Sequence, residues 1–443
     1  MYMPPKPGSK IIIVGGGCFG LSTAFALALK KKYHVVVFDR QPIPSSDAAS
    51  TDISKCVRYD YGNKLLYMQL TMEAMPHWHQ WNKERAEQNE SPVFEQTGVL
   101  LMGYQGTFGP YEEQSMQAIC EAGYGHAIEK LLTPESIIQK YPQFEQTVRN
   151  GYDIAYVNKD GGWCNSEEAI KHLYGKCVGE GVDFVVGQDQ GCFEDLWLDD
   201  NDKGIVKGIV TQDGTHHVAD TVLMTTGAWT ASLVDVKDQL QATGHVVMHF
   251  EPKEPLRQSL ASIPAWAADI TRTGYYGFPV NADGKLKIAH HFESGYLNPR
   301  EKDHVSTPRT HVDHANDTIP ISAVQHARAS LAEIFPATSS MDITYTRTCW
   351  YSDSVDGGYL VSPHPSYKNL VIASGDSGHG MKVLPVIGYK ICHVIEGIES
   401  DYSRAWAWRT TTVPENQGNI GKHKTMGDGQ HNDRFATQDE LLC

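Results

Sequence analysis

The chain has 443 residues, of which 41% are hydrophobic and 21% charged, and its formal net charge is −15 at pH 7. This length exceeds what one simple core holds, so we expect two closely packed domains. The acidic balance argues against a nucleic-acid partner, and no apolar run reaches the roughly 20 residues that span a bilayer. The nine cysteines form no Cys-x-x-Cys pair, which argues against a disulfide framework and against a metal site.

The two ends of the sequence bear on location. Residues 1–10 are short and polar, and the apolar stretch after them leads into glycines rather than into a small-residue cleavage site. Residues 440–443 are not a peroxisomal address of the Ser-Lys-Leu type. We expect an intracellular, cytoplasmic protein, and a peroxisomal location stays open.

Hydrophobic periodicity predicts alternating strands and helices at both ends of the chain. The expected strands are 10–14, 34–38, 183–186, 204–211 and 221–225, and the expected helices are 18–29, 166–180, 324–335 and 385–397. The fold class is therefore α/β. We expect a Rossmann-type dinucleotide domain assembled from 1–85, 152–240 and 338–410, a substrate domain on a mixed or antiparallel sheet from 86–151 and 241–337, and a surface tail over 411–443.

A dinucleotide-binding motif lies between the first strand and the first helix. Gly15, Gly17 and Gly20 form Gly-x-Gly-x-x-Gly, which provides a tight turn, a close backbone approach to a pyrophosphate and close helix packing. Asp39 ends the second strand, where an acid accepts a hydrogen bond from a ribose hydroxyl. The motif alone does not separate NAD from FAD. Two later strand-to-loop segments, 220–229 and 369–385, favour FAD, because a nicotinamide dehydrogenase needs no such late element.

Four blocks, 9–39, 50–62 (STDISKCVRYDYG), 274–293 and 345–388, carry a family resemblance. Together they resemble the FAD-dependent amine oxidases typified by monomeric sarcosine oxidase, pipecolate oxidase and fructosyl amino acid oxidases. The resemblance extends from about residue 10 to about residue 409. It implies an oxidase that acts on a carbon–nitrogen bond of an amine, reduces O2 to H2O2 and works as a monomer.

The resemblance also implies roles for individual residues. Cys349, in Thr-Cys-Trp-Tyr, matches a cysteine that carries the flavin through a thioether; from composition alone it reads as one more buried thiol. The residues implied to bind FAD are Gly15, Gly17, Phe19, Gly20, Asp39, Arg40, Ser50, Lys55, Gly227, Trp229, Cys349, Gly375, Asp376, Gly378, Gly380, Met381 and Lys382.

The implied substrate site is cationic and aromatic. Arg58 and Lys382 match a pair that clamps a substrate carboxylate, and Arg409 is a third candidate cation. Catalytic roles are implied for Tyr276, Lys287, His291 and Tyr351, with Lys287 promoting O2 reduction. Taken singly, each cation also reads as a solvated surface charge. The role of His379, which touches the flavin or merely packs, stays open.

Several segments resemble fungal fructosyl amino acid oxidases more closely, among them Pro-Ile-Pro-Ser-Ser at 42–46 and Asp-Ser-Gly-His at 376–379. Those enzymes place a glutamate near the position of His291, and an imidazole cannot replace its two charged oxygens as an acceptor for a polyol. We therefore predict an oxidase of a secondary or N-methylated amino acid whose imine product hydrolyses or cyclises. The alternative is a fructosyl amino acid or peptide oxidase (amadoriase). Rivals from other classes are a flavin dehydrogenase with a protein or quinone acceptor, an NAD-dependent dehydrogenase and a non-catalytic FAD-binding protein.

Overall fold

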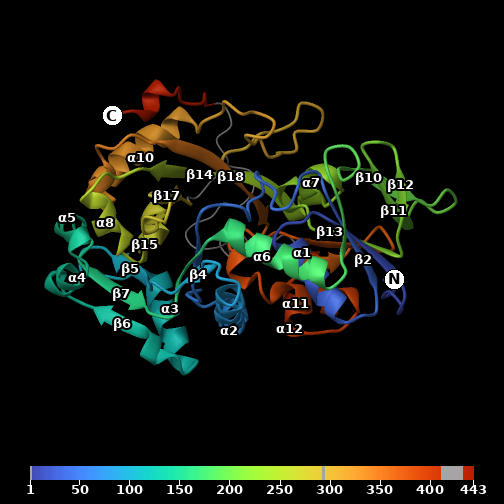
Figure 1. Ribbon diagram of the computed structural model, residues 1–443, viewed down its shortest axis with the longest axis horizontal. Helices are drawn as coiled ribbons and strands as arrows, with labels where there is room; N and C mark the ends of the chain where they lie inside the picture. The colour runs from blue at the N-terminus through green and yellow to red at the C-terminus, as the bar shows by residue number, and fades with distance from the viewer. Residues whose placement is uncertain (1, 292–294, 411–432) are drawn as a thin grey trace.

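The computed structural model describes residues 2–291, 295–410 and 433–443, and two large sheets organise it (Figure 1). The first sheet has six strands in the order β19-β20-β13-β1-β2-β9. Their bounds are β1 Lys10–Val14, β2 His34–Asp39, β9 Asp183–Val186, β13 Thr221–Met224, β19 Leu360–Pro363 and β20 Leu370–Ser374. All neighbours in this sheet are parallel except β19 and β20. This sheet is the core of the Rossmann-type domain that the sequence predicts.

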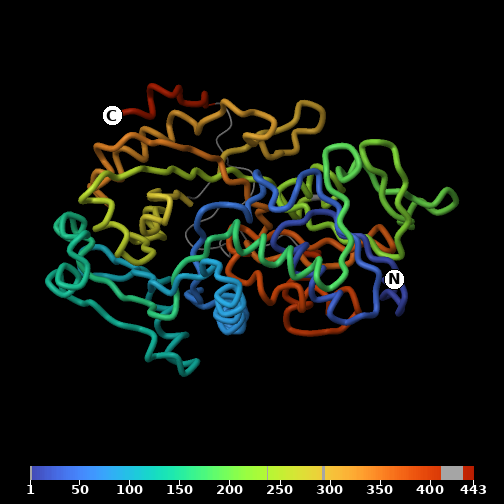
Figure 2. Tube along the Cα trace, in the orientation of Figure 1, coloured from blue at the N-terminus to red at the C-terminus, as the bar shows by residue number. Residues whose placement is uncertain are grey.

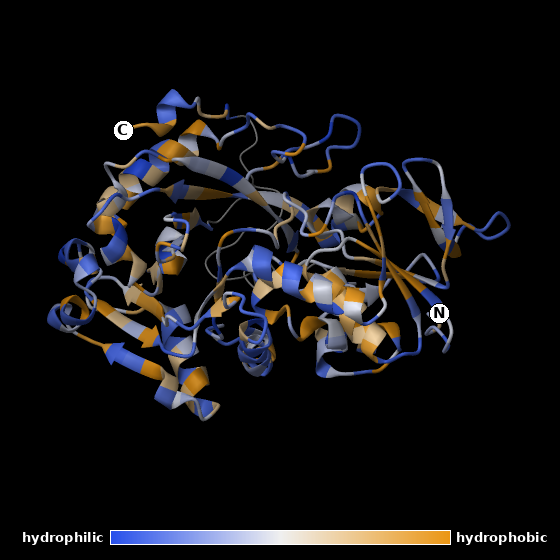
Figure 3. Ribbon diagram, in the orientation of Figure 1, coloured by the Kyte–Doolittle hydropathy of each residue, from blue (hydrophilic) through white to orange (hydrophobic). Residues whose placement is uncertain are grey.

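Helices cover one face of this sheet. They are α1 (Cys18–Leu29), α2 (Leu65–Ala86), α6 (Ser166–Gly179), α11 (Ile387–Ile395) and α12 (Asp401–Ala405). Helices α1 and α11 lie side by side although they come from opposite ends of the chain (Figure 2). They approach closely because Gly388 has no side chain: a Cβ there would lie 1.9 Å from the carbonyl oxygen of Ser22. Hydrophobic residues are concentrated at this contact (Figure 3).

A small antiparallel sheet packs on the opposite face. It consists of β10 (Phe193–Leu198), β11 (Val206–Thr211) and β12 (His216–Val218). A further three-stranded sheet, β3 (Lys55–Val57), β8 (Gly162–Cys164) and β4 (Phe94–Glu95), joins the loop after β2 to the second half of the molecule.

The second large sheet has eight strands in the order β18-β14-β17-β16-β15-β5-β7-β6 and is antiparallel except between β15 and β5. The strands are β5 Val99–Gly103, β6 Ile128–Leu131, β7 Ile154–Asn158, β14 Leu240–Phe250, β15 Ala265–Ala268, β16 Tyr275–Gly277, β17 Leu286–His290 and β18 Tyr345–Ser354. The helices of this half are α3 Pro110–Glu121, α4 Pro134–Lys140, α5 Glu145–Arg149, α8 Leu256–Ala261, α9 Ile270–Thr273 and α10 Ile321–Ile334, and α7 (Thr230–Leu233) precedes β14. The outer face of the sheet packs on α10 through a second hydrophobic core.

Two strands lie in a different sheet from the one that the predicted boundaries assigned to them. The ranges 152–240 and 338–410 were expected in the dinucleotide domain, but β7 and β18, which fall inside them, hydrogen-bond into the eight-stranded sheet. A strand's own residues do not reveal its partner, which explains the difference.

The C-terminal segment differs from the expected surface tail where the structure describes it. Residues 411–432 of that prediction lie outside the described residues. Phe435 forms an antiparallel bridge with Pro320, and Ala436 and Leu441 are buried in the core beside α10. Three apolar residues in a polar segment are enough to anchor it. No helix among the described residues is long and apolar enough to span a membrane.

Candidate active site

A cavity of about 330 Å³ opens at the carboxyl ends of the parallel strands, where α/β sheets bind ligands. Twelve of the residues that the sequence predicts to bind a dinucleotide line it: Gly15, Gly17, Phe19, Asp39, Arg40, Ser50, Lys55, Gly227, Trp229, Asp376, Gly378 and Met381. The cavity begins at the β1–α1 loop. Helix α1 starts there without a side-chain cap at Gly17, which leaves backbone N–H groups for a phosphate.

Glycines shape this end of the cavity. Gly15 has a φ of +104°, and a Cβ on it would lie 2.5 Å from the carbonyl oxygen of Thr225. A Cβ on Gly20 would lie 1.9 Å from the carbonyl oxygen of Gly15. Gly20 does not line the cavity but allows the helix to meet the loop, and Gly375 and Gly380 likewise stand behind the lining residues.

Asp39 holds the loop and retains capacity for a ligand. Its Oδ2 accepts a hydrogen bond from the Gly16 backbone N–H at 2.8 Å. Its Oδ1 accepts from the Gln41 backbone N–H at 2.9 Å and from the Ser45 hydroxyl at 3.0 Å. A carboxylate has about four acceptor positions, so one stays available for a ribose hydroxyl. The glycine cradle, the uncapped helix and this acid together fit a dinucleotide.

A second cavity, of about 100 Å³, adjoins the first, and the two share Lys55, Tyr351, Gly378 and Met381. Its lining includes the predicted substrate-site residues Arg58, Tyr276, Lys287, His291, Tyr351 and Lys382, and also His379. The sequence therefore identified six side chains that the fold brings together around one cavity beside the dinucleotide site.

Strand register explains how the eight-stranded sheet gathers these side chains. Lys287 pairs with His249, and Ala289 pairs with both Val247 and Tyr276. Because side chains alternate between faces along a strand, alternate positions of β14, β17 and β18 point to the same face. That face meets the dinucleotide domain, and the other face packs on α10.

Arg58 and Lys382 supply two buried cations to the cavity, 6% and 7% exposed. The Arg58 guanidinium donates through Nη1 to the Asp60 carbonyl at 2.7 Å and to the Tyr111 hydroxyl at 2.6 Å. The Lys382 ammonium lies 4.8 Å from the centre of the Tyr61 ring, and the described residues give it no carboxylate ion pair. Burial, together with the positive charge of Arg58, lowers the pKa of Lys382 to about 7. An anionic ligand would relieve both effects.

Lys287 forms a buried ion pair with Asp52, a residue that the sequence did not single out. The Lys287 ammonium donates to Asp52 Oδ2 and to the Ser54 carbonyl, both at 2.6 Å. Burial lowers the pKa of Lys287 to about 8, and Asp52 opposes that shift. Burial alone would raise the pKa of Asp52, but Lys287, Lys55 and Arg347 hold it well below its usual range. The pair is therefore charged at neutral pH.

The aromatic side chains of Tyr276, Tyr351 and His291 also line this cavity. The Tyr276 and Tyr351 hydroxyls share a hydrogen bond, and burial raises the pKa of Tyr276 to about 12. The His245 ring stacks on Tyr351 with centroids 4.2 Å apart and lies 5.0 Å from the His291 ring. His245 Nε2 is 3.3 Å from the Thr243 hydroxyl. His245 was not predicted, because a histidine on a strand carries no signal without the register.

Cys349 lies beside the cavities rather than in their lining. It is 1% exposed and packs with Val247, Ala289 and Tyr351, against Ala49 and Tyr276. Ala49 lines the dinucleotide cavity and Tyr276 lines the substrate cavity, so Cys349 stands at their junction.

Arg409 and His379 are engaged in other contacts. Arg409 is outside the lining of the substrate cavity and forms a two-pronged ion pair with Asp356, at 2.8 and 3.2 Å. His379 lines the substrate cavity and is held by the Tyr61 hydroxyl at Nδ1 and by the Gly357 carbonyl at Nε2. Burial lowers its pKa well below the usual range, so this ring is neutral.

A dinucleotide cavity at a parallel sheet, joined to a cationic cavity on a second sheet, defines a dinucleotide-dependent oxidoreductase with two domains. A family model described as "FAD dependent oxidoreductase" (DAO) matches residues 10–393. The chain belongs to this family and is an FAD-dependent oxidoreductase.

Known relatives cover nearly the whole chain. L-saccharopine oxidase of Schizosaccharomyces pombe is 30% identical over 90% of this chain and 93% of the relative. A monomeric sarcosine oxidase of a Bacillus species is 25% identical over 85% of this chain and 90% of the relative. Among solved structures, a modified fructosyl peptide oxidase from Aspergillus nidulans superposes with a TM-score of 0.83 at 26% identity, covering 96% of this chain and 98% of that one.

Proposed function

We propose that this enzyme oxidises the carbon–nitrogen bond of a secondary or N-methylated amino acid and reduces O2 to H2O2. One observation carries the proposal: Arg58 and Lys382, two buried cations, line a small cavity that adjoins the FAD site. A substrate carboxylate would complete such a site, because Arg58 lowers the pKa of buried Lys382 and the nearby Asp60 carboxylate already accepts from Tyr156 and Asn158. Relatives named for saccharopine, sarcosine and N-methyl-L-tryptophan support a substrate of this kind.

The carboxylate clamp orients the substrate. Arg58 has one nitrogen committed to Asp60 and Tyr111, which fixes the guanidinium plane and leaves the other N–H groups for the ligand. Lys382 adds a second charge-assisted bond. With the carboxylate held there, the amine and its C–H bond extend toward Lys55 and Tyr351, which both cavities share. FAD, when bound, supplies the acceptor for the hydride equivalent.

The cavity also favours the reactive form of the amine. A neutral amine has the lone pair that drives loss of the C–H hydrogen, and nearby Arg58, Lys382, Lys55 and Lys287 disfavour a protonated amine. Tyr276, Tyr351 and His291 form an aromatic wall against which the substrate side chain packs. The product is an imine that water hydrolyses or that cyclises.

Oxygen reduction is assigned to Lys287. Its ammonium lines the substrate cavity and is fixed by Asp52 and the Ser54 carbonyl, so a positive charge is in place before O2 acquires its first electron. For Cys349 we propose a thioether to the flavin, supported by its position at the junction of the cavities and by Lys55 and Arg347, cations that act on it electrostatically. We also propose that the enzyme is a monomer.

A fructosyl amino acid or peptide oxidase is the second candidate, favoured by the structural similarity to such an enzyme over nearly the whole chain. Against it stands His291, which cannot accept two hydrogen bonds from a polyol as a carboxylate does.

The deciding experiment is H2O2 production with a panel of sarcosine, pipecolate, N-methyl aromatic amino acids, saccharopine and fructosyl amino acids. Turnover of the N-alkyl amino acids without the fructosyl compounds is the expected result. Turnover of the fructosyl compounds alone would refute the proposal in favour of the second candidate. An Arg58→Met variant serves as a control, because it should raise the KM of every carboxylate-bearing substrate that uses the clamp.

A further inference from the structure

One wall of the FAD cavity is made of three side chains from distant parts of the chain: Arg40, Asp47 and Trp350. Arg40 forms an ion pair with Asp47 and lies 4.8 Å above the Trp229 ring. Asp47 is buried, and so is Trp350, which follows Cys349 on β18. We call these three residues the outer wall.

A single loop segment holds the outer wall from outside. Residues 309–313, here called the strap, belong to the long connection between β17 and α10. The Trp350 indole N–H donates to the Arg309 carbonyl at 2.8 Å. The Thr310 hydroxyl donates to Asp47 Oδ2 at 3.0 Å. The Arg40 guanidinium donates to Asp313 at 3.3 Å. Each of the three wall residues is thus tied to one residue of the strap.

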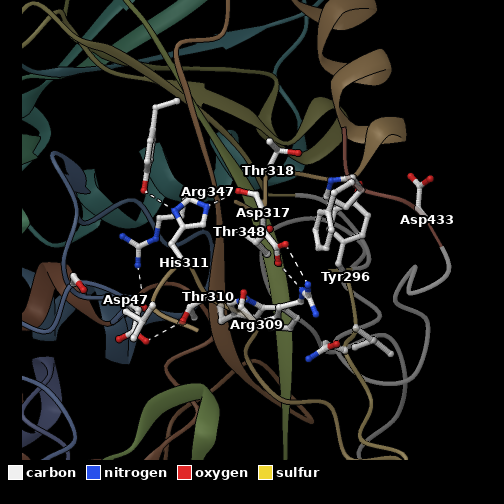
Figure 4. A pocket seen from close by; sticks show the side chains of 18 residues that line it. Asp47, Tyr296, Arg309, Thr310, His311, Asp317, Thr318, Arg347, Thr348 and Asp433 are labelled. Atoms are coloured by element: carbon white, nitrogen blue, oxygen red, sulfur yellow. Dashed lines mark hydrogen bonds and ion pairs between the residues drawn. The ribbon is translucent and has the colours of Figure 1, made fainter. Parts of the chain in front are cut away.

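The strap is itself held by contacts within the same connection and by one contact with β18. Arg309 forms a two-pronged ion pair with Asp317, at 2.5 and 3.1 Å. His311 Nε2 lies 2.8 Å from the Asp317 carbonyl oxygen, and its ring packs on the edge of Tyr345. Figure 4 shows the Arg309–Asp317 pair and the bond from Thr310 to Asp47 side by side.

Behind the outer wall lies an open cavity of about 480 Å³, lined by described residues, that the proposed reaction does not use. Asp47 and Trp350 line this outer cavity and also the FAD cavity, so they separate the two. Polar groups of the outer cavity, including Arg309, Asp317, Thr310 and His311, already have partners within the protein. The outer cavity therefore offers space rather than a set of unpaired ligand-binding groups.

We propose that the strap and the outer wall form the gate through which FAD enters its cavity before the proposed link to Cys349 forms, and through which unlinked FAD leaves. When the bonds from the strap break, the outer wall has the outer cavity to move into, and no helix or strand has to unfold. When the bonds form, the wall closes over the cofactor. The proposal rests on FAD binding and not on the identity of the amine substrate.

Protein contacts that are present only in the closed state set the barrier to opening. The bond from Thr310 to Asp47 is buried and charge-assisted, so its removal should speed FAD release about tenfold. The Asp313 carboxyl is half exposed, so loss of its bond to Arg40 should have a smaller effect. Filling the outer cavity should act differently, because it blocks the opened wall without touching the closed one.

The test measures exchange of bound FAD against excess isotope-labelled FAD in holoenzyme carrying Cys349→Ser, in which binding is reversible. Thr310→Val should exchange FAD about tenfold faster, and Asp313→Asn faster by a smaller factor. Asp303→Asn is the matched control: it removes a carboxylate of the same connection that pairs with Arg300 and makes no bond to Arg40, Asp47 or Trp350. Exchange in this control should equal that of the parent. Equal rates in Thr310→Val and the parent would overturn the proposal.

A second variant tests whether the strap and the outer wall open as a gate or only hold FAD in place. Leu297→Trp adds bulk in the outer cavity and removes no side-chain hydrogen bond. It should slow FAD exchange while leaving the Kd for FAD unchanged, because entry and exit slow by the same factor. Leu132→Trp, at an exposed site far from the cofactor, is the control for the added indole. Unchanged exchange in Leu297→Trp would show that FAD takes another route.

Discussion

The ammonium of Lys287 lies 2.6 Å from Asp52 Oδ2, although 235 residues separate them in the chain. This bond crosses from the eight-stranded sheet to the loop after β2, which lines the FAD cavity. Asp52 therefore sets both the position and the charge of the proposed oxygen-activating group. A charge fixed before the reaction needs no reorganisation when O2 is reduced.

Replacing Lys287 should separate the two half-reactions. We expect Lys287→Met to slow the reaction of the reduced enzyme with O2 by about 10²–10³-fold, as loss of one preorganised donor does elsewhere. Reduction by the amine under anaerobic conditions should change little, because Lys287 does not hold the carboxylate. Stopped-flow measurements of both half-reactions check this. Equal losses in both would contradict the assignment.

Asp52→Asn gives a pH-dependent version of the same experiment. Lys287, with a pKa of about 8, is charged below that pH and loses its charge as pH rises through it. Asp52 raises the pKa of Lys287, so the amide variant should lose the ammonium at lower pH. The rate with O2 should then fall at a lower pH in Asp52→Asn than in the wild type. Coincident pH profiles would show that Asp52 does not tune Lys287.

The strand and helix on either side of the Gly-x-Gly-x-x-Gly motif were the most predictable elements. The bounds of β1 and α1 match the prediction residue for residue, because Ile11–Val14 and the small residues of α1 carry an undivided local pattern. Asp52 and His245 were not found, since their roles depend on contacts across the sheet and between domains. Arg409, the third candidate cation, pairs with Asp356, and no sequence pattern marks that acid as its partner.

We predict that Lys382 takes up a proton when a carboxylate ligand binds to the clamp formed by Arg58 and Lys382. Lys382, with a pKa of about 7, is partly neutral in the free enzyme near pH 7 and becomes fully charged as pH falls. A carboxylate ligand stabilises the charged form, so a carboxylate that lacks the amine should bind more tightly as pH falls from 8 to 6. Titration of flavin absorbance at several pH values checks this. In Lys382→Met the dependence over that range should disappear.

Arg58 supplies the matched comparison for the clamp. Its positive charge lowers the pKa of Lys382, so Arg58→Met should move the binding transition to higher pH. The variant should also raise the KM for the amino acid by about 10–100-fold through loss of a charge-assisted bond. If carboxylate binding in Arg58→Met changes at the same pH as in the wild type, burial alone sets the pKa of Lys382.

We predict that Cys349 holds the flavin covalently. The wild-type protein should retain its flavin after acid precipitation and show a fluorescent band on a denaturing gel. Cys349→Ser should release its flavin on precipitation yet bind FAD through the glycine cradle when native. Cys164→Ser is the control, because that thiol is equally buried in another core. Covalent flavin in Cys349→Ser would refute the proposed linkage.

Replacement of His245 should weaken substrate binding without loss of the flavin. His245→Asn removes the ring that stacks on Tyr351 at 4.2 Å and lies beside His291. We expect the KM for the amine to rise about tenfold, with kcat less affected and the flavin spectrum retained, because stacked rings are worth about 0.5–1.5 kcal/mol beyond their burial. His245→Phe keeps the stacking but loses the contact with Thr243, so it should recover most of the KM. Failure of phenylalanine to rescue would assign the role of His245 to its hydrogen bond.

Alanine substitution should have opposite effects at two glycines, Gly20 and Gly175. Gly20→Ala places a Cβ 1.9 Å from the Gly15 carbonyl oxygen, so the β1–α1 loop has to move and FAD binding should be lost. Gly175→Ala, within α6, meets nothing within 4 Å and should raise the free energy of unfolding by roughly 0.5–1 kcal/mol. FAD titration and thermal unfolding of both variants check this. Since the chemical change is the same, opposite outcomes would trace the FAD defect to the contact between helix and loop rather than to a general loss of glycine flexibility.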